Sequence, residues 1–187
     1  PAFRLCRSTR PAGTLAALSV IDEVRPRDIN IRKVQQTLLD AGAYLMPLFD
    51  VDPTDKDFQS IQRATVSGIL KVKGEPWKWA NRTWFYPDTI ITVNEFTSGL
   101  NAFEQNVPVN SDPVLLTVQT TIKILSDYLG KDISGEVVKI WERRMSRKFS
   151  LNLTVTKREL SVVVDELLQP FGKSIGFDGN YLSTREE

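Results

Sequence analysis

The sequence contains the same helix-start signal twice, and this repetition constrains the fold more than any other feature. Thr92 precedes Glu95 by three residues at the start of an apolar run, and Thr156 precedes Glu159 in the same way. In such a capping box the threonine hydroxyl accepts a hydrogen bond from the glutamate's backbone amide, and the carboxylate accepts one from the threonine's amide. The pattern therefore predicts two capped helices in a chain built mainly from helices.

The surroundings of the two capping boxes indicate a weak internal duplication. Residues 58–103 and 114–168 each read as a helix, a connecting segment, a capping box and a second helix. Residues 106–113 are polar and contain two prolines, as is typical of a boundary. We therefore predict a mostly α fold with short β segments, in which residues 46–108 and 109–187 form two helical units.

A further pair of helices is predicted within residues 11–42. The first is rich in small apolar residues, has a proline in its first turn and ends before Pro26. Asn30 is placed to cap the second, whose apolar residues repeat at the spacing of a buried stripe. We treat residues 1–45 as a separate N-terminal part.

Composition argues against most kinds of catalytic and metal site. The 187 residues include no histidine, which is the commonest general base and metal ligand, and a single cysteine. No glycine-rich phosphate-binding loop is present. We therefore expect no catalytic residue, no metal site and no cofactor bound by this chain alone.

The charge balance limits the partners. A formal net charge of +1 gives no electrostatic reason to expect nucleic acid or an anionic membrane. No apolar run approaches the roughly 20 residues of a membrane-spanning helix. We therefore expect neither nucleic acid nor a membrane span.

Two local segments call for separate interpretation, and the first is acidic. Asp50, Asp52, Asp55 and Asp57 lie close together, but the central glycine and the final glutamate of a calcium loop are missing. We interpret the segment as a turn followed by a helix whose first turn favours acids.

The second segment, residues 74–88, is aromatic and is predicted to be a long loop. Its aromatic side chains either form a stacking surface for a sugar or a protein partner, or fill the core between two helices. We expect Trp84 and Phe85 to be buried. Trp77 and Trp79 are expected to be exposed, and they are candidate ligand-binding residues.

Residues 11–45 resemble the C-terminal end of the FAD-dependent oxidoreductase domain found in many bacteria, including polysaccharide-degrading Bacteroidetes. The similarity lies in the small residues of the first helix, the Pro-Arg-Asp turn and the helix that follows it. In that family the start of the first helix approaches the flavin. The resemblance implies that Ala12, Gly13 and Thr14 contact FAD in a parent protein.

The remainder resembles S-layer homology repeats. The resemblance is carried by the Gly-Ile-Leu of residues 68–70, the aromatic-Pro-Asp of residues 85–88 and the two capping boxes. In true S-layer modules an arginine of the capping-box motif helps to bind an anionic cell-wall sugar. Val93 stands at that position in the first copy and Lys157 in the second, so the resemblance makes Lys157 a candidate ligand-binding residue.

Together these resemblances imply a non-catalytic C-terminal accessory region of a FAD-dependent oxidoreductase. It would pack on its own flavoprotein domain or bind a partner. The alternative is a carbohydrate or cell-envelope binding module that uses the aromatic segment 77–86. Either function would favour a periplasmic or cell-envelope location.

Overall fold

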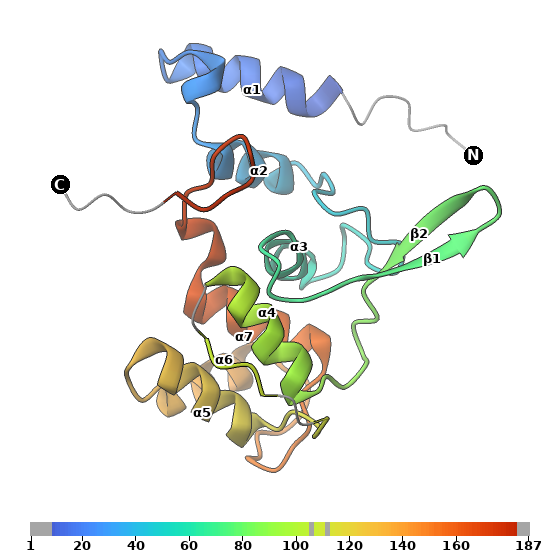
Figure 1. Cartoon of the computed structure of the whole chain (residues 1–187), viewed down its shortest axis with the longest axis vertical. Helices are drawn as coiled ribbons and strands as arrows, with labels where there is room; N and C mark the ends of the chain where they lie inside the picture. Colours follow the sequence, from blue (N-terminus) through green and yellow to red (C-terminus); the bar gives the residue numbers. More distant parts are fainter. Residues whose placement is uncertain (1–8, 105–106, 111–112, 183–187) are drawn as a thin grey trace. The chain divides into compact units, whose positions relative to one another are not determined.

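The computed structural model describes residues 9–104, 107–110 and 113–182. Within these residues the chain forms seven α-helices and one two-stranded antiparallel sheet (Figure 1). The predicted mostly α fold with short β segments is therefore confirmed. The described residues divide into two compact units: the first comprises residues 9–45 and 171–182, and the second comprises those between Met46 and Pro170.

The first unit is built around a helix pair. Helix α1 (Thr9–Ile21) is followed by the short 3-10 helix η1 (Pro26–Asp28) and by α2 (Ile31–Asp40). Asn30 caps α2 as predicted, because its side-chain oxygen accepts hydrogen bonds from the amides of Arg32 and Lys33, the second and third residues of the helix. The core of this unit lies where α2 meets α1 and contains buried Ile29, Val34 and Leu38.

Residues 171–182 belong to the same unit, and Arg32 holds them against α2. This arginine is buried, and its Nε donates to the carbonyl of Lys173 at 3.1 Å. Its guanidinium also lies 4.5 Å from the ring centre of Phe171, in the 3-10 helix η2 (Pro170–Gly172). A cation over an aromatic face is a favourable contact, and it is stronger where water is excluded.

The second unit contains the other five helices, the hairpin described below and most of the buried residues. Helix α3 packs against α7, and α6 packs against both α7 and α5. The unit's core includes the fully buried side chains of Ile61, Phe96, Leu125 and Leu160. The predicted subdivision at residue 108 rests on internal similarity and not on compactness, and it stays a prediction. The helices are α3 (Phe58–Val66), α4 (Val93–Phe103), α5 (Val118–Leu129), α6 (Ser134–Arg144) and α7 (Lys157–Leu168).

Both predicted capping boxes are present, at the starts of α4 and α7. The Thr92 hydroxyl accepts from the amide of Glu95 at 3.2 Å, and the Glu95 carboxylate accepts from the amide of Thr92 at 3.0 Å. Thr156 and Glu159 make the same reciprocal pair at 3.3 and 2.9 Å. Each box satisfies two amides that a helix start otherwise leaves without a partner.

A third helix, α5, also begins directly after a capping threonine. Thr117 caps α5 by accepting from the amide of Thr120 at 3.2 Å, so this helix begins four residues later than the apolar run that starts at Val114. We had expected the helix to include that whole run. Residues 114–117 are instead extended, because they pair with the segments that lead into the other two capped helices.

The three lead-in segments close a ring of backbone hydrogen bonds. The amide of Ile91 donates to the carbonyl of Val155, Val155 donates to Leu116, and Leu116 donates back to Ile91. All three side chains are buried. Each of these residues immediately precedes a capping threonine, so the starts of α4, α5 and α7 are fixed relative to one another by this ring.

The acidic segment is anchored by arginines, and no metal is needed to explain it. Asp55 pairs with Arg158 at 2.7 Å, and buried Asp57 lies 3.1 Å from Arg144 and 3.4 Å from Arg158. The interpretation as a turn before a helix is confirmed, since α3 begins directly after Asp57. Among the described residues no group of acids is placed to hold a metal ion.

The aromatic segment differs from its prediction. It forms a β-hairpin, with β1 (Lys73–Trp77) paired to β2 (Ala80–Trp84), and not a long loop. The two-residue turn contains neither glycine nor asparagine, the residues that usually signal such a hairpin. Lys78 in this turn adopts a φ of 53°, which L-residues rarely take.

Candidate functional site: an exposed aromatic hairpin

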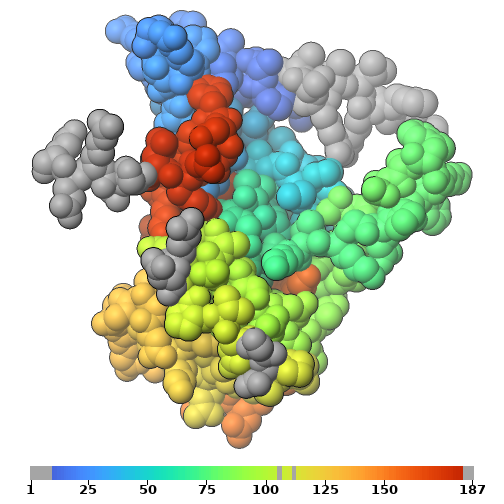
Figure 2. Space-filling model, viewed as in Figure 1, coloured from blue at the N-terminus to red at the C-terminus, as the bar shows by residue number. Residues whose placement is uncertain are grey.

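The pairing of β1 with β2 sorts the hairpin's side chains onto two faces. Because alternate residues of a strand point to opposite faces, Glu75 and Trp77 share one face with their cross-strand neighbours Arg82 and Ala80. Trp84, two residues after Arg82, lies on the same face. Figures 1 and 2 show the hairpin as an arm that extends away from the helices of its unit.

Five side chains form a continuous stacked row, which we call the aromatic row: Trp77, Arg82, Phe49, Trp84 and Tyr86. The guanidinium of Arg82 lies 3.8 Å from the centre of Trp77 and 4.0 Å from the centre of Phe49. Phe49 continues the row to Trp84 at 5.5 Å between ring centres, and Trp84 stacks on Tyr86 at 5.8 Å. Such contacts hold the rings at fixed positions relative to one another.

The hairpin and the adjoining Phe49 expose large aromatic surfaces. At the tip Trp79 is 94% exposed and Trp77 49%, and Phe49 beside the second strand is 58% exposed, whereas Phe85 at the base is fully buried. The predicted exposure of Trp77 and Trp79 and the predicted burial of Phe85 are therefore confirmed. Trp84, which was also predicted to be buried, is only half-buried because it lies within the row at the surface of the hairpin. Ligand binding by Trp77 and Trp79 stays a prediction. A tryptophan that leaves nearly all of its surface in water contributes little to folding, so its presence here favours a role in binding.

Aromatic rings cover both faces of the Arg82 guanidinium, but its N–H edge is open. Within the part of the chain that the structure describes, its N–H groups form no hydrogen bond or ion pair. Glu75 lies directly across the hairpin, but its carboxylate accepts from Tyr86 at 2.8 Å and pairs with Lys73 at 3.0 Å. The hydrogen bonds from Tyr86 and Lys73 lower the pKa of Glu75, so this acid is ionised and already paired. A planar guanidinium held between two rings can therefore donate its edge to oxygen atoms of a ligand.

The base of the hairpin is held rigidly by the rest of its unit. The Asp50 carboxylate accepts from the amides of Phe85 and Tyr86 at 2.9 and 2.6 Å. The amide of Phe49 donates to the carbonyl of Thr83 at 2.8 Å, which places the Phe49 ring in the aromatic row. Asp50, which the sequence singles out only as part of an acidic turn, thus positions Phe85 and Tyr86, the last two aromatic residues of the segment.

Lys157 supports this base and lies away from the exposed tip. Its Nζ donates to the carbonyls of Lys71 and Phe85 at 2.8 and 3.2 Å, one on each side of the hairpin. Burial lowers the pKa of Lys157, and the carboxylates of Glu95 and Asp50 partly oppose that effect. The structure therefore does not bring Lys157 together with Trp77 and Trp79. A role for Lys157 in binding stays a prediction.

Comparison with protein-family models, curated proteins and solved structures found no match. The aromatic row is thus the strongest indication of function, and two of its members were missed in the sequence. Neither Phe49 nor Arg82 was singled out. The spacing of two residues from Glu75 to Trp77, and again from Arg82 to Trp84, is nevertheless typical of two strands that share one face.

No described helix is long and apolar enough to cross a membrane.

The three residues that the resemblance relates to FAD lie on α1 in the first unit. Ala12 and Gly13 are exposed and Thr14 is half-buried. Gly13 and Thr14 line a shallow hollow of about 380 Å³ together with Leu38 and Ala43. Their role in a parent flavoprotein stays a prediction.

Proposed function

We propose that this chain is a non-catalytic binding module whose aromatic hairpin binds a saccharide. The observation that carries the proposal is the aromatic row, with Trp77 held at its end and Trp79 exposed beside it. Flat aromatic faces match the apolar faces of sugar rings, and the edge of Arg82 supplies donors for sugar hydroxyl or carboxylate oxygens.

A nucleic acid is a poorer match for this surface. Single-stranded nucleic acids also stack on aromatic rings, but they require a positively charged groove that follows several phosphates. The hairpin carries only Lys73, Lys78 and Arg82, and Lys73 is paired with Glu75. With a net charge of +1 for the chain, a phosphate backbone would gain little.

We further propose that the module is the accessory region of a FAD-dependent oxidoreductase, with S-layer-like units as its scaffold. The capping boxes at the starts of α4 and α7, one in each of the two predicted units, support the second point. Helix α1 supports the first, since Val20 and Ile21 are 78% and 71% exposed there and could pack on another domain. Intact mass and an absorbance scan of the natural protein test it: a species of only this mass without flavin bands would refute the parentage.

Saccharide binding is tested by sedimentation with insoluble polysaccharides: purified bacterial cell wall, chitin, cellulose and xylan. We expect the chain to bind at least one, and Trp79→Ala to weaken that binding about fivefold, because one aromatic stacking contact contributes about 1 kcal/mol. Phe177→Ala is the matched control, since Phe177 is a similarly exposed aromatic residue outside the hairpin.

Two results would overturn the saccharide proposal. One is the absence of binding to all four polysaccharides. The other is equal binding by Trp79→Ala and wild type. Acrylamide quenching gives an independent check of the surface, because Trp79 and Trp77 should be accessible while buried Trp141 should not.

A further inference from the structure

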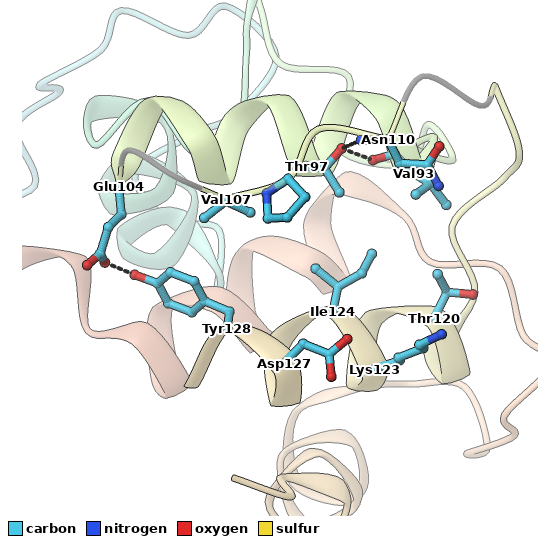
Figure 3. A pocket seen from close by; sticks show the side chains of 11 residues that line it. Val93, Thr97, Glu104, Val107, Asn110, Thr120, Lys123, Ile124, Asp127 and Tyr128 are labelled. Carbon is cyan, nitrogen blue, oxygen red and sulfur yellow. Dashed lines mark hydrogen bonds between the residues drawn. The ribbon is translucent and has the colours of Figure 1, made fainter. Parts of the chain in front are cut away.

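A cavity of about 530 Å³ lies in the second unit between α4 and α5, and residues 107–110 form its third side (Figure 3). It is separate from the aromatic hairpin and shares no residue with it. Cavities of this size are typical of small-molecule sites. The inference that follows is therefore independent of saccharide binding.

The walls of the cavity are aliphatic. Val93 of α4, Ile124 of α5 and the pair Val107 and Pro108 line it from its three sides. Figure 3 shows Val107 facing the α5 side of the cavity, where Ile124 points upward toward α4. An aliphatic group of a ligand would remove these side chains from water, which is favourable in proportion to the area covered.

The polar groups on α4 and on residues 107–110 are already in use. The Thr97 hydroxyl accepts from the amide of Asn110 at 3.1 Å and itself donates to the carbonyl of Val93. At the opposite end Tyr128 donates its hydroxyl hydrogen to Glu104. These hydrogen bonds lie at the two ends of the cavity. The charged side chains that are left for a ligand lie along α5, which forms one rim of the cavity.

That rim carries two opposite charges that do not pair. Lys123 and Asp127 are one helical turn apart, the spacing at which such residues normally form an ion pair. Both line the cavity, and within the described ranges neither side chain forms a hydrogen bond or ion pair. The remaining ionisable side chains of the lining, Glu104 and Tyr128, are hydrogen-bonded to each other. A ligand with one negative and one positive group would therefore find a partner for each.

We propose that this cavity binds a short zwitterionic peptide with aliphatic side chains, of about two residues. The two charged side chains arise about 6 Å apart along α5, because they are four residues apart at a rise of about 1.5 Å per residue. The terminal ammonium and carboxylate of an extended dipeptide are separated by about 7 Å, whereas in a free amino acid they adjoin the same carbon. The peptide carboxylate faces Lys123, its ammonium faces Asp127, and an aliphatic side chain contacts Ile124 and Val107.

The test is an NMR titration of the ¹⁵N-labelled chain with L-leucyl-L-leucine. Free L-leucine and N-acetyl-leucyl-leucine amide, which lacks both charges, are titrated in parallel. We expect shifts of the backbone amides around Val107 and Ile124. An exposed ion pair contributes up to about 1 kcal/mol. Each ion pair that the dipeptide forms with Lys123 or Asp127 should therefore make it bind up to about fivefold more tightly than the blocked compound.

Lys123→Met and Asp127→Asn should each weaken dipeptide binding, whereas the matched control Lys131→Met should not. Lys131 is exposed, pairs with Glu136 and lies outside the cavity. Far-ultraviolet circular dichroism establishes that each variant is folded. Absence of cavity shifts at millimolar dipeptide would overturn the proposal, as would equal affinity for the blocked compound. Tighter binding of free leucine would overturn the assignment to a peptide.

Discussion

Gly99→Ala should destabilise the second unit strongly, although alanine is the better helix former. Gly99 lies in the middle of α4, where it is buried. A Cβ atom built at this position would lie 1.9 Å from the carbonyl oxygen of Ile69 and 2.8 Å from its carbonyl carbon. Those atoms belong to the backbone, so no change of side-chain rotamer can relieve the contact.

The magnitude follows from two opposing effects. Alanine favours a helix interior over glycine by about 1 kcal/mol. Against this, a carbon and a carbonyl oxygen approach no closer than about 3.3 Å, so the helix or the segment at Ile69 would have to move by more than 1 Å. Overpacking of a rigid core typically costs about 1–3 kcal/mol and sometimes more. We expect a net loss of at least about 2 kcal/mol, because a backbone group cannot move without disturbing its neighbours.

The assay is urea unfolding followed by tryptophan fluorescence. All four tryptophans lie in the second unit, so the signal reports that unit and not the helix pair of the first. Gly135→Ala is the matched control. Gly135 is an exposed helical glycine of α6, and a Cβ atom there would meet nothing within 4 Å.

The control should leave stability unchanged or raise it by up to about 1 kcal/mol. If Gly99→Ala unfolded at the same urea concentration as wild type, or at a higher one, the close packing of α4 on Ile69 would be refuted. A loss in both variants would instead show that glycine matters at both sites for a reason other than packing.

Two further predictions concern the capped helices and acid stability. Thr92→Ala and Thr156→Ala should each lower the free energy of unfolding by about 1 kcal/mol in the same urea assay, and a negligible loss would contradict the capping geometry. Burial raises the pKa of Asp55, but the hydrogen bond and charge of Arg158 outweigh burial and leave the pKa lowered. A carboxyl group whose pKa is lowered in the folded state stabilises the fold at pH values above its unfolded pKa of about 3.9. This stabilisation is lost as the pH falls through the folded pKa. Asp55→Asn should therefore be less stable than wild type at pH 7, and the difference should shrink below about pH 4. A difference that is constant with pH would contradict this ion pair.

Local signals in the sequence were sufficient for the helix starts. Thr92 and Thr156 could be recognised because a capping box involves only four consecutive residues. Thr117 could not, since the residue three positions later is a threonine and the apolar run begins before it. The extended conformation of residues 114–117 is imposed by pairing with distant segments, which no local pattern encodes.

The candidate site could be predicted only in part, for a similar reason. The exposure of Trp77 and Trp79 is predicted correctly. Phe49 joins the aromatic row because the chain near Leu48 pairs with Thr83, more than thirty residues later. Arg82 acquires its role from the register of the hairpin, and the turn at Lys78 gives no sequence signal for a hairpin.

The ring that links Ile91, Leu116 and Val155 also bears on how the protein is made. A ribosome extends the chain from its N-terminus, so the first of these residues emerges long before the last. Until Val155 is available, two of the three ring bonds are missing, and α3 lacks α7, the helix against which it packs. The second unit therefore completes its folding only near the end of its own synthesis. Until then the apolar faces of its earlier helices lack part of the surface that covers them in the finished unit, and exposed apolar surface of this kind is prone to aggregation.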